Sequence, residues 1–312
     1  MKLRVSELLV YWLARAAIGT AARVPQWLGY TCADWLGRLF FFCHRRRRGY
    51  ALHLLRNAFP QRPERELLRI GSRATGNLFK VPLDMARLTR LLARGGRIDS
   101  VLDYGESKRQ LAIPRPWLGV TAHLGNWEVG AVCVAQFLGT AHGVGRIARN
   151  PLLERWILAN RNRGGLTIHP RRGGIRGLAK ALDAGQVGLM VVDQNQRLRG
   201  VFAPFFGEIA SCERSAVTLA LRRGYPIVVG IALRRGRGFR FDFVAAGPFV
   251  LERTGDKQKD LYAGVVRVNQ VIEDIVRRSP EQYLWIHDRY RTQPPPGGTA
   301  TDVDGDELDA EP

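Results

Sequence analysis

Residues 117 to 138 read WLGVTAHLGNWEVGAVCVAQFL, and this stretch decides the fold. Its first six residues are almost all apolar and predict a short buried strand at 117–122, while 127–138 predicts an apolar helix directly after it. The same alternation continues along the chain. We expect further strands at 143–148, 187–192, 226–233 and 239–244, and helices at 152–163, 175–184, 215–223 and 257–278. Strands alternating with helices indicate an α/β fold with a mostly parallel central sheet flanked by helices.

The chain of 312 residues divides into three predicted parts. Residues 1–48 form an amphipathic N-terminal segment, residues 49–292 the main domain, and residues 293–312 a tail. The tail combines a Pro/Gly run with six acidic residues and almost nothing apolar, which is typical of disorder.

Composition limits the kinds of partner and cofactor. With 48 Lys and Arg against 28 Asp and Glu, the formal charge is +20, which favours phosphate-bearing polymers or anionic lipid surfaces as partners. A base-composition bias towards Arg explains the charge equally well. The Arg residues are spread out and no DNA or RNA recognition motif occurs, so we expect no nucleic-acid partner. The four cysteines form no C-x-x-C pair, and no Gly-rich phosphate loop occurs, so we expect neither a metal nor a cofactor.

The N-terminal segment predicts contact with a membrane surface. Charged residues interrupt positions 3–43 too often for a spanning helix or a signal peptide. Apolar and aromatic residues are nevertheless abundant, and a polybasic run at 45–48 follows them. This pattern is typical of a helix that lies on a bilayer with Trp12, Trp27, Trp35 and residues 40–42 at the acyl boundary. The alternative is that these are ordinary amphipathic helices that cover the rest of the fold, with the Arg run as a solvated loop.

Two polar clusters follow predicted strands. His123-Leu-Gly-Asn-Trp-Glu128 comes after the first core strand, and Asp193-Gln-Asn195 comes after the most apolar one. Because ligands of parallel sheets gather at the carboxyl ends of strands, both clusters are candidate sites. An imidazole that titrates near neutrality can remove the proton of an attacking hydroxyl, and a carboxylate beside it fixes the tautomer. We therefore predict His123 as the catalytic base and Glu128 as the residue that orients it.

The spacing of His123 and Glu128 alone is weak support, because chance yields such a pair often and a core histidine beside a carboxylate is common. Around this pair we predict substrate-binding roles for Asn126, Asp193 and Asn195. Asp193 alternatively caps a helix or turn. His287 is interpreted as a packing histidine rather than a second base.

A series of phrases in one order resembles the bacterial lipid A biosynthesis acyltransferases, the lauroyl/myristoyl transferase family within the glycerolipid acyltransferase superfamily. The resemblance covers about residues 27–294. The matching phrases are Arg56-Asn-Ala-Phe-Pro60, His123-Leu-Gly-Asn-Trp-Glu128, Arg149-Asn-Pro, Asn160-Arg161, Arg176-Gly-Leu-Ala-Lys-Ala-Leu, Asp193-Gln-Asn195, Phe205-Phe-Gly207 and Trp285-Ile-His287.

The resemblance implies an enzyme at the cytoplasmic face of the inner membrane. It implies O-acyl transfer from an acyl carrier protein thioester, or acyl-CoA, to a hydroxyl of a lipid A precursor, with His123 and Glu128 as the catalytic pair and Arg149 as a phosphate ligand. Arg171 and Arg172 are weaker candidates for anionic contact. Two departures from the family pattern, Cys212 and Asp288, leave other polar lipids open as acceptors. A non-enzymatic basic binding protein is the alternative of a different class.

Overall fold

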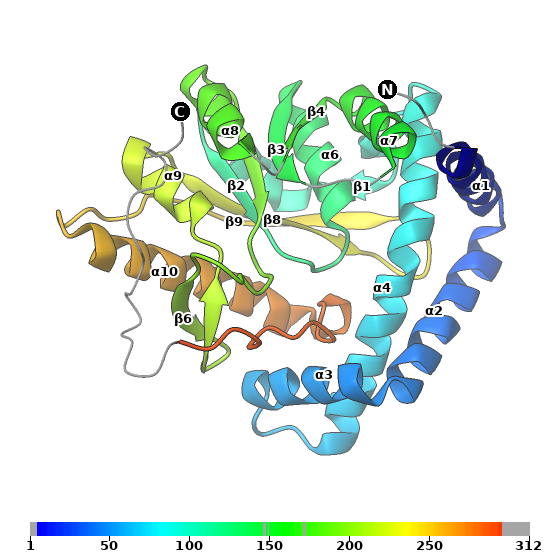
Figure 1. Cartoon of the computed structure of the whole chain (residues 1–312), viewed down its shortest axis with the longest axis horizontal. Coiled ribbons are helices and arrows are strands. Elements are labelled where there is room, and N and C mark those ends of the chain that lie inside the picture. The colour runs from blue at the N-terminus through cyan, green and yellow to red at the C-terminus, as the bar shows by residue number, and fades with distance from the viewer. Residues whose placement is uncertain (1–4, 146–147, 149, 171–172, 295–312) are drawn as a thin grey trace.

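A seven-stranded sheet forms the centre of the computed structural model, which describes residues 5–145, 148, 150–170 and 173–294 (Figure 1). From one edge to the other its strands are β1 (Leu102–Asp103), β9 (Phe241–Phe249), β8 (Ile227–Arg234), β2 (Leu118–Thr121), β5 (Gly188–Val191), β3 (Ala141–Gly145) and β4 (Leu166–Pro170). The five strands from β8 to β4 run parallel, and β9 pairs antiparallel with β8. The predicted α/β fold with a mostly parallel sheet is therefore confirmed.

Helices cover both faces of the sheet, with α6 on one side and α8, α9 and α10 on the other. In chain order the helices of the described residues are α1 (Val5–Ala21), α2 (Gln26–Cys43), α3 (Arg45–Ala58), α4 (Glu64–Ala93), α5 (Lys108–Leu111), α6 (Trp127–Leu138), α7 (Pro151–Arg163), α8 (Gly174–Asp183), α9 (Ser215–Arg223) and α10 (Lys257–Arg278), with short 3-10 turns at 98–100, 105–107 and 280–282. Because side chains alternate along β2, Trp117 joins one apolar core with α6, whereas Leu118 and Val120 join the other with α8, α9 and α10.

Three predicted helices, at 127–138, 215–223 and 257–278, have the observed bounds. The other predicted helices and strands differ by one to five residues at their ends. The edge strand β4 was not predicted. Nor was the separate antiparallel hairpin of β6 (Val201–Phe205) and β7 (Glu208–Cys212), which packs on α10.

The N-terminal helices are integrated with the main domain rather than separate from it. Helix α2 lies along α4 (Figure 1), where a Cβ on Gly37 would lie only 2.7 Å from the Cα of Gly76. Phe41 is fully buried there, so the predicted membrane role of all three residues at 40–42 is wrong for this one. Helix α3 also runs across the predicted boundary at residue 48. Most of the predicted tail, 295–312, lies outside the described residues.

The outer faces of α1 and α2 remain strongly apolar. Trp27 and Trp35 are 73% and 70% exposed, and on the same two helices Trp12, Leu36, Leu39 and Phe42 are exposed as well. One face of α2 therefore packs on α4 while the opposite face offers large apolar side chains to the surroundings. Among the described residues, no helix has both the length and the hydropathy needed to cross a bilayer.

Candidate active site

A tight turn at the carboxyl end of β2 carries His123. The backbone of this turn is fixed by neighbouring strands, because Asn126 N–H donates to the carbonyl of Ala232 on β8 at 2.9 Å. Gly125 has φ +62°, and a Cβ there would lie 2.1 Å from the same carbonyl oxygen. Only glycine fits this close approach. The turn therefore holds His123 at the sheet edge and starts α6 four residues later.

His123 is paired with Asp193, which follows the adjacent parallel strand β5. The imidazole Nδ1 lies 2.7 Å from Oδ1 of Asp193, and the backbone N–H of His123 donates to Oδ2 at 2.8 Å. An ionised carboxylate can only accept, so Nδ1 carries the proton and Nε2 has the free lone pair. Gln194 Nε2 lies 3.2 Å from this Nε2, and the centroid of the Trp127 ring lies 4.5 Å from that of the imidazole, with the two ring planes tilted by 57°.

The pair is electrostatically coupled. Burial disfavours the charged imidazole, but the charge and hydrogen bond of Asp193, with the charge of Glu128, raise the pKa of His123 above 6.5. Burial likewise opposes ionisation of Asp193, yet His123 and Arg289 hold the pKa of this carboxyl below its usual value. His123 therefore has the geometry of an oriented general base.

Glu128 does not orient His123, which corrects the expectation from the sequence. Its carboxylate is bound by both sides of the Arg161 guanidinium, with Arg161 Nε donating to Oε2 at 3.0 Å and Nη2 donating to Oε1. Glu128 lies in the first turn of α6 and Arg161 near the end of α7. Glu128 acts on His123 through its charge, whereas Asp193 makes the hydrogen bond.

Asn126 is not placed to touch a substrate. Its side chain is fully buried, and its oxygen accepts from the backbone N–H groups of Glu128 and Val129, which caps α6. Its amide nitrogen donates to Asp84 of α4 at 2.9 Å. Asp84, also fully buried, accepts from Tyr30 at 2.6 Å and pairs with Arg234. Asn126 therefore stabilises the turn and the start of α6.

The structure places the other residues that were predicted to bind substrate in different surroundings. Asp193 is 4% exposed and its carboxylate is engaged with His123, so it is not placed as a substrate ligand. The side chain of Asn195 both donates to and accepts from Thr292, so its amide is used internally. Arg149, Arg171 and Arg172 lie outside the described residues.

Sequence reasoning assigned no role to Arg161, Asp84 or Tyr283. Arg161 was part of a matching phrase, but nothing in the phrase pairs it with Glu128. Tyr283 is buried beside the site, and this burial, together with the negative charge of Asp193, raises its pKa. Its β-bridge with Leu124 joins segments that are 159 positions apart, and no local sequence pattern indicates such a contact.

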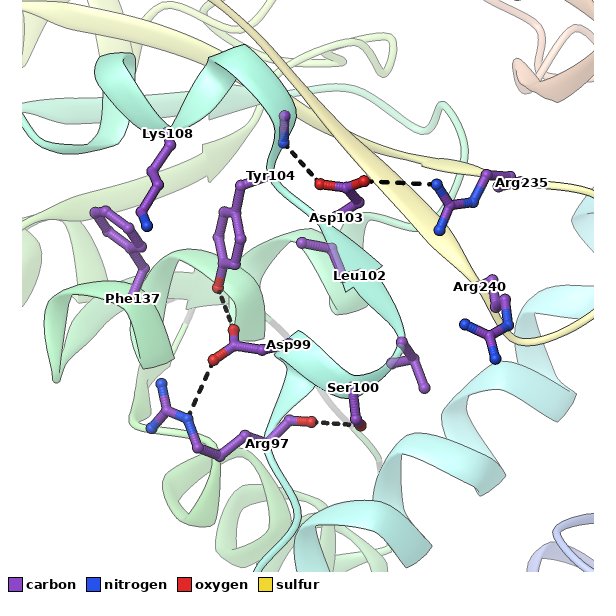
Figure 2. A pocket seen from close by; sticks show the side chains of 12 residues that line it. Arg97, Asp99, Ser100, Leu102, Asp103, Tyr104, Lys108, Phe137, Arg235 and Arg240 are labelled. Carbon is purple, nitrogen blue, oxygen red and sulfur yellow. Dashed lines mark hydrogen bonds and ion pairs between the residues drawn. The ribbon is translucent and has the colours of Figure 1, made fainter.

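Cavities of different size lie near the sheet, and two of those lined by described residues bear on where the site lies. The larger, about 650 Å³, lies at the β1 edge and contains none of the predicted site residues (Figure 2). Both of its carboxylates are paired, Asp99 with Arg97 and Asp103 with Arg235. The smaller, about 30 Å³, is an apolar space beneath Trp127 lined by Gly119, Gly130 and Gly230 among others. Within the described ranges no group of three or more His, Cys, Asp and Glu could hold a metal.

The chain is similar to known acyltransferases in sequence. The model of a family described as bacterial lipid A biosynthesis acyltransferase matches residues 1–292. The chain is 26% identical to the lipid A biosynthesis lauroyltransferase of Escherichia coli (strain K12) over 302 residues, covering 91% of this chain and 93% of that protein. It is 29% identical to the lipid A biosynthesis palmitoleoyltransferase of the same organism over 125 residues, or 39% of each protein. Among solved structures, the 1-acyl-sn-glycerophosphate acyltransferase PlsC of Thermotoga maritima has 12% identity and a TM-score of 0.34, covering 80% of this chain and 96% of that one.

Proposed function

Because the chain belongs to the bacterial lipid A biosynthesis acyltransferase family and is an acyltransferase, we propose that it moves a fatty acyl group from a thioester to a hydroxyl of a lipid A precursor. The observation that carries the proposal is the pairing of His123 with the buried Asp193, which leaves Nε2 free to accept a proton. A non-enzymatic basic binding protein, the alternative from composition, is set aside by family membership.

The reaction is a direct transfer. Nε2 of His123 takes the proton of the acceptor hydroxyl as its oxygen attacks the thioester carbonyl carbon. The carbon–sulfur bond of the tetrahedral intermediate then breaks, and the leaving thiolate accepts the proton from the imidazolium. Asp193 stabilises the imidazolium and holds the ring, because its carboxylate lies against Nδ1. Gln194 occupies the position next to Nε2 that the hydroxyl needs, so its exposed side chain turns away when the acceptor binds.

Glu128 and Arg161 support this step electrostatically. The charge of Glu128 helps to raise the pKa of His123, and Arg161 prevents the carboxylate from rotating away. Glu128 thus contributes to catalysis through its charge and not by orienting the ring.

The donor in this proposal is an acyl carrier protein thioester, with acyl-CoA as the alternative. Both are acidic, and the chain has a formal charge of +20. Opposite charges speed the encounter of donor and enzyme. The acceptor is a lipid, so the site must operate at a bilayer surface.

The outer faces of α1 and α2 support such a position at the cytoplasmic leaflet of the inner membrane. Their exposed Trp and Leu side chains fit the acyl boundary of a bilayer, and Arg45 to Arg48 at the start of α3 fit the lipid phosphates. These helices would lie on the bilayer with the apolar face inserted.

Mass spectrometry of total lipid from matched strains tests the proposal. One strain carries the wild-type chain and the other His123→Gln, at equal protein level. An acyl increment on lipid A that is lost in the variant supports the proposal. An increment on another polar lipid shows that this lipid is the acceptor instead of lipid A. Identical lipids in both strains contradict acyl transfer with His123 as the base.

A further inference from the structure

The segment 282–292, here called the closing segment, ties together the two loops of the site. The carbonyl of Gln282 accepts from Gly125 N–H at 3.1 Å, and Leu284 N–H donates to the carbonyl of His123 at 3.0 Å. At its far end Thr292 exchanges two hydrogen bonds with Asn195. The closing segment therefore holds the His123 turn and the Asp193 loop in one frame.

His287 lies in the middle of this segment and has a defined tautomer. Its Nε2 accepts the backbone N–H of Asn195 at 3.1 Å. A ring nitrogen that accepts carries no proton, so the proton of the neutral ring is on Nδ1. Burial lowers the pKa of His287; Asp193 opposes this, but the nearby cations Arg289, His123 and Arg47 add to it. The ring is therefore neutral near pH 7 and presents an N–H at Nδ1.

The Nδ1–H group is available to a ligand. The ring is only partly buried, and within the described part of the chain no hydrogen bond to Nδ1 is present. Hydrogen bonds tie His287 to the site, because its N–H donates to the carbonyl of Leu284, whose own N–H donates to the carbonyl of His123. Its anchor, Asn195, is two residues from the carboxylate that holds the base. An N–H donor without a hydrogen-bond partner among the described residues is thus held on the segment that joins the His123 turn to the Asp193 loop.

We propose that His287 is a catalytic residue whose Nδ1–H donates to the thioester carbonyl oxygen as that oxygen becomes negatively charged. This inference rests on the proposed acyl transfer. As the acceptor oxygen bonds to the carbonyl carbon and its proton passes to His123, the carbonyl π electrons move onto the oxygen that faces His287. When the carbon–sulfur bond breaks, those electrons re-form the carbonyl, the thiolate takes the proton from His123, and His287 keeps its own proton throughout. A preorganised donor at such an oxygen accelerates the step because it stabilises charge that develops only there.

Two substitutions separate this role from a structural one. His287→Gln keeps an acceptor that reaches Asn195 N–H but removes the Nδ1 donor, whereas His287→Asn places an amide N–H near the Nδ1 position and cannot reach Asn195. His53→Gln is the control, because His53 also bonds through Nε2, to Glu208, and contacts Tyr290 of the closing segment from outside the site.

The measurement is acyl transfer by purified full-length protein, with thermal unfolding of each variant. We expect His287→Gln to lower kcat by about 10²-fold with KM within about threefold, His287→Asn to lose less, and His53→Gln to match the wild type. A kcat of His287→Gln within about threefold of the wild type overturns the inference while acyl transfer stands. If the wild type itself transfers no acyl group, the proposed function fails instead. Ring nitrogen chemical shifts of the wild type give a test that does not depend on folding of the variants, because a proton on Nε2 of His287 also overturns the inference.

Discussion

Oδ1 of Asp193 lies 2.7 Å from Nδ1 of His123, although the two residues are 70 positions apart in the chain. Strands β2 and β5 run side by side and end at the same edge, so the residues that follow them meet. Glu128, only five positions from His123, is held by Arg161 instead. The paired histidine and carboxylate thus follow two neighbouring strands.

Asp193→Asn removes the charge but keeps an oxygen for the backbone N–H of His123. The variant has no carboxylate to stabilise the imidazolium, so we expect kcat to fall by about 10²-fold or more with KM little changed. Steady-state acyl transfer checks this. Glu213→Gln, in which the changed carboxylate contacts the start of α9, is the matched control and should keep its activity. Equal loss in both variants would contradict the assignment.

Glu128 and Arg161 should be coupled in stability. Their side chains are 15% and 16% exposed, so loss of either partner leaves a largely buried charge without its ion pair. We expect Glu128→Gln and Arg161→Met each to lower the free energy of unfolding by about 2 kcal/mol, and the double variant to lose less than the sum. Denaturant unfolding of the four proteins gives the coupling. Strict additivity would show that the pair is not a stabilising unit.

Asn126→Ala should affect stability rather than substrate affinity. The change removes the cap of α6 and one partner of Asp84, and we expect about 1–2 kcal/mol lower free energy of unfolding. Asp84→Ala, which leaves Arg234 buried without its ion pair, should cost about 3–5 kcal/mol. A raised KM in Asn126→Ala with unchanged unfolding would restore Asn126 as a substrate ligand.

The exposed face of α1 and α2 predicts the strength of membrane binding. Trp27→Ala and Trp35→Ala each remove a large apolar side chain that would insert, and we expect roughly tenfold weaker binding to vesicles with anionic lipid for each change. Co-sedimentation measures this. Val250→Ala, an exposed apolar residue after β9, serves as the control. Undiminished binding of the double tryptophan variant would place the membrane contact elsewhere.

Much of the fold could be predicted because its signals are local. Helix α6 follows the side-chain cap of Asn126 and ends before Gly139 at φ +86°, and α10 follows the cap of Asp256. The missed hairpin of β6 and β7 is joined by Phe206 and Gly207, both with positive φ. Two five-residue strands with a bulky residue in that turn lack the usual hairpin signature. The edge strand β4 ends in a proline, which weakens its pattern.

The position of the candidate site in the fold could be predicted from the sequence, but the pairing of its side chains could not. The rule that ligands gather at the carboxyl ends of parallel strands brought His123 and Asp193 to one edge. The carboxylate that bonds to the His123 ring is determined by the order of the strands and by the pairing of Arg161 with Glu128. Neither can be recognised from a local sequence pattern. For the same reason the sequence could not distinguish a packing role from a catalytic one for His287, whose anchor is the backbone of Asn195.

The most direct test of His123 as a general base held by Asp193 is the pH dependence of kcat for acyl transfer. Asp193 and Glu128 raise the pKa of His123, and only the neutral ring accepts a proton. The wild-type rate should therefore fall as pH drops through a single ionisation above about 6.5. In Asp193→Asn the lost charge lowers this pKa, so the acid limb should move to lower pH on a reduced plateau. A wild-type rate that is independent of pH in this range, or an acid limb that does not move in the variant, would contradict the account.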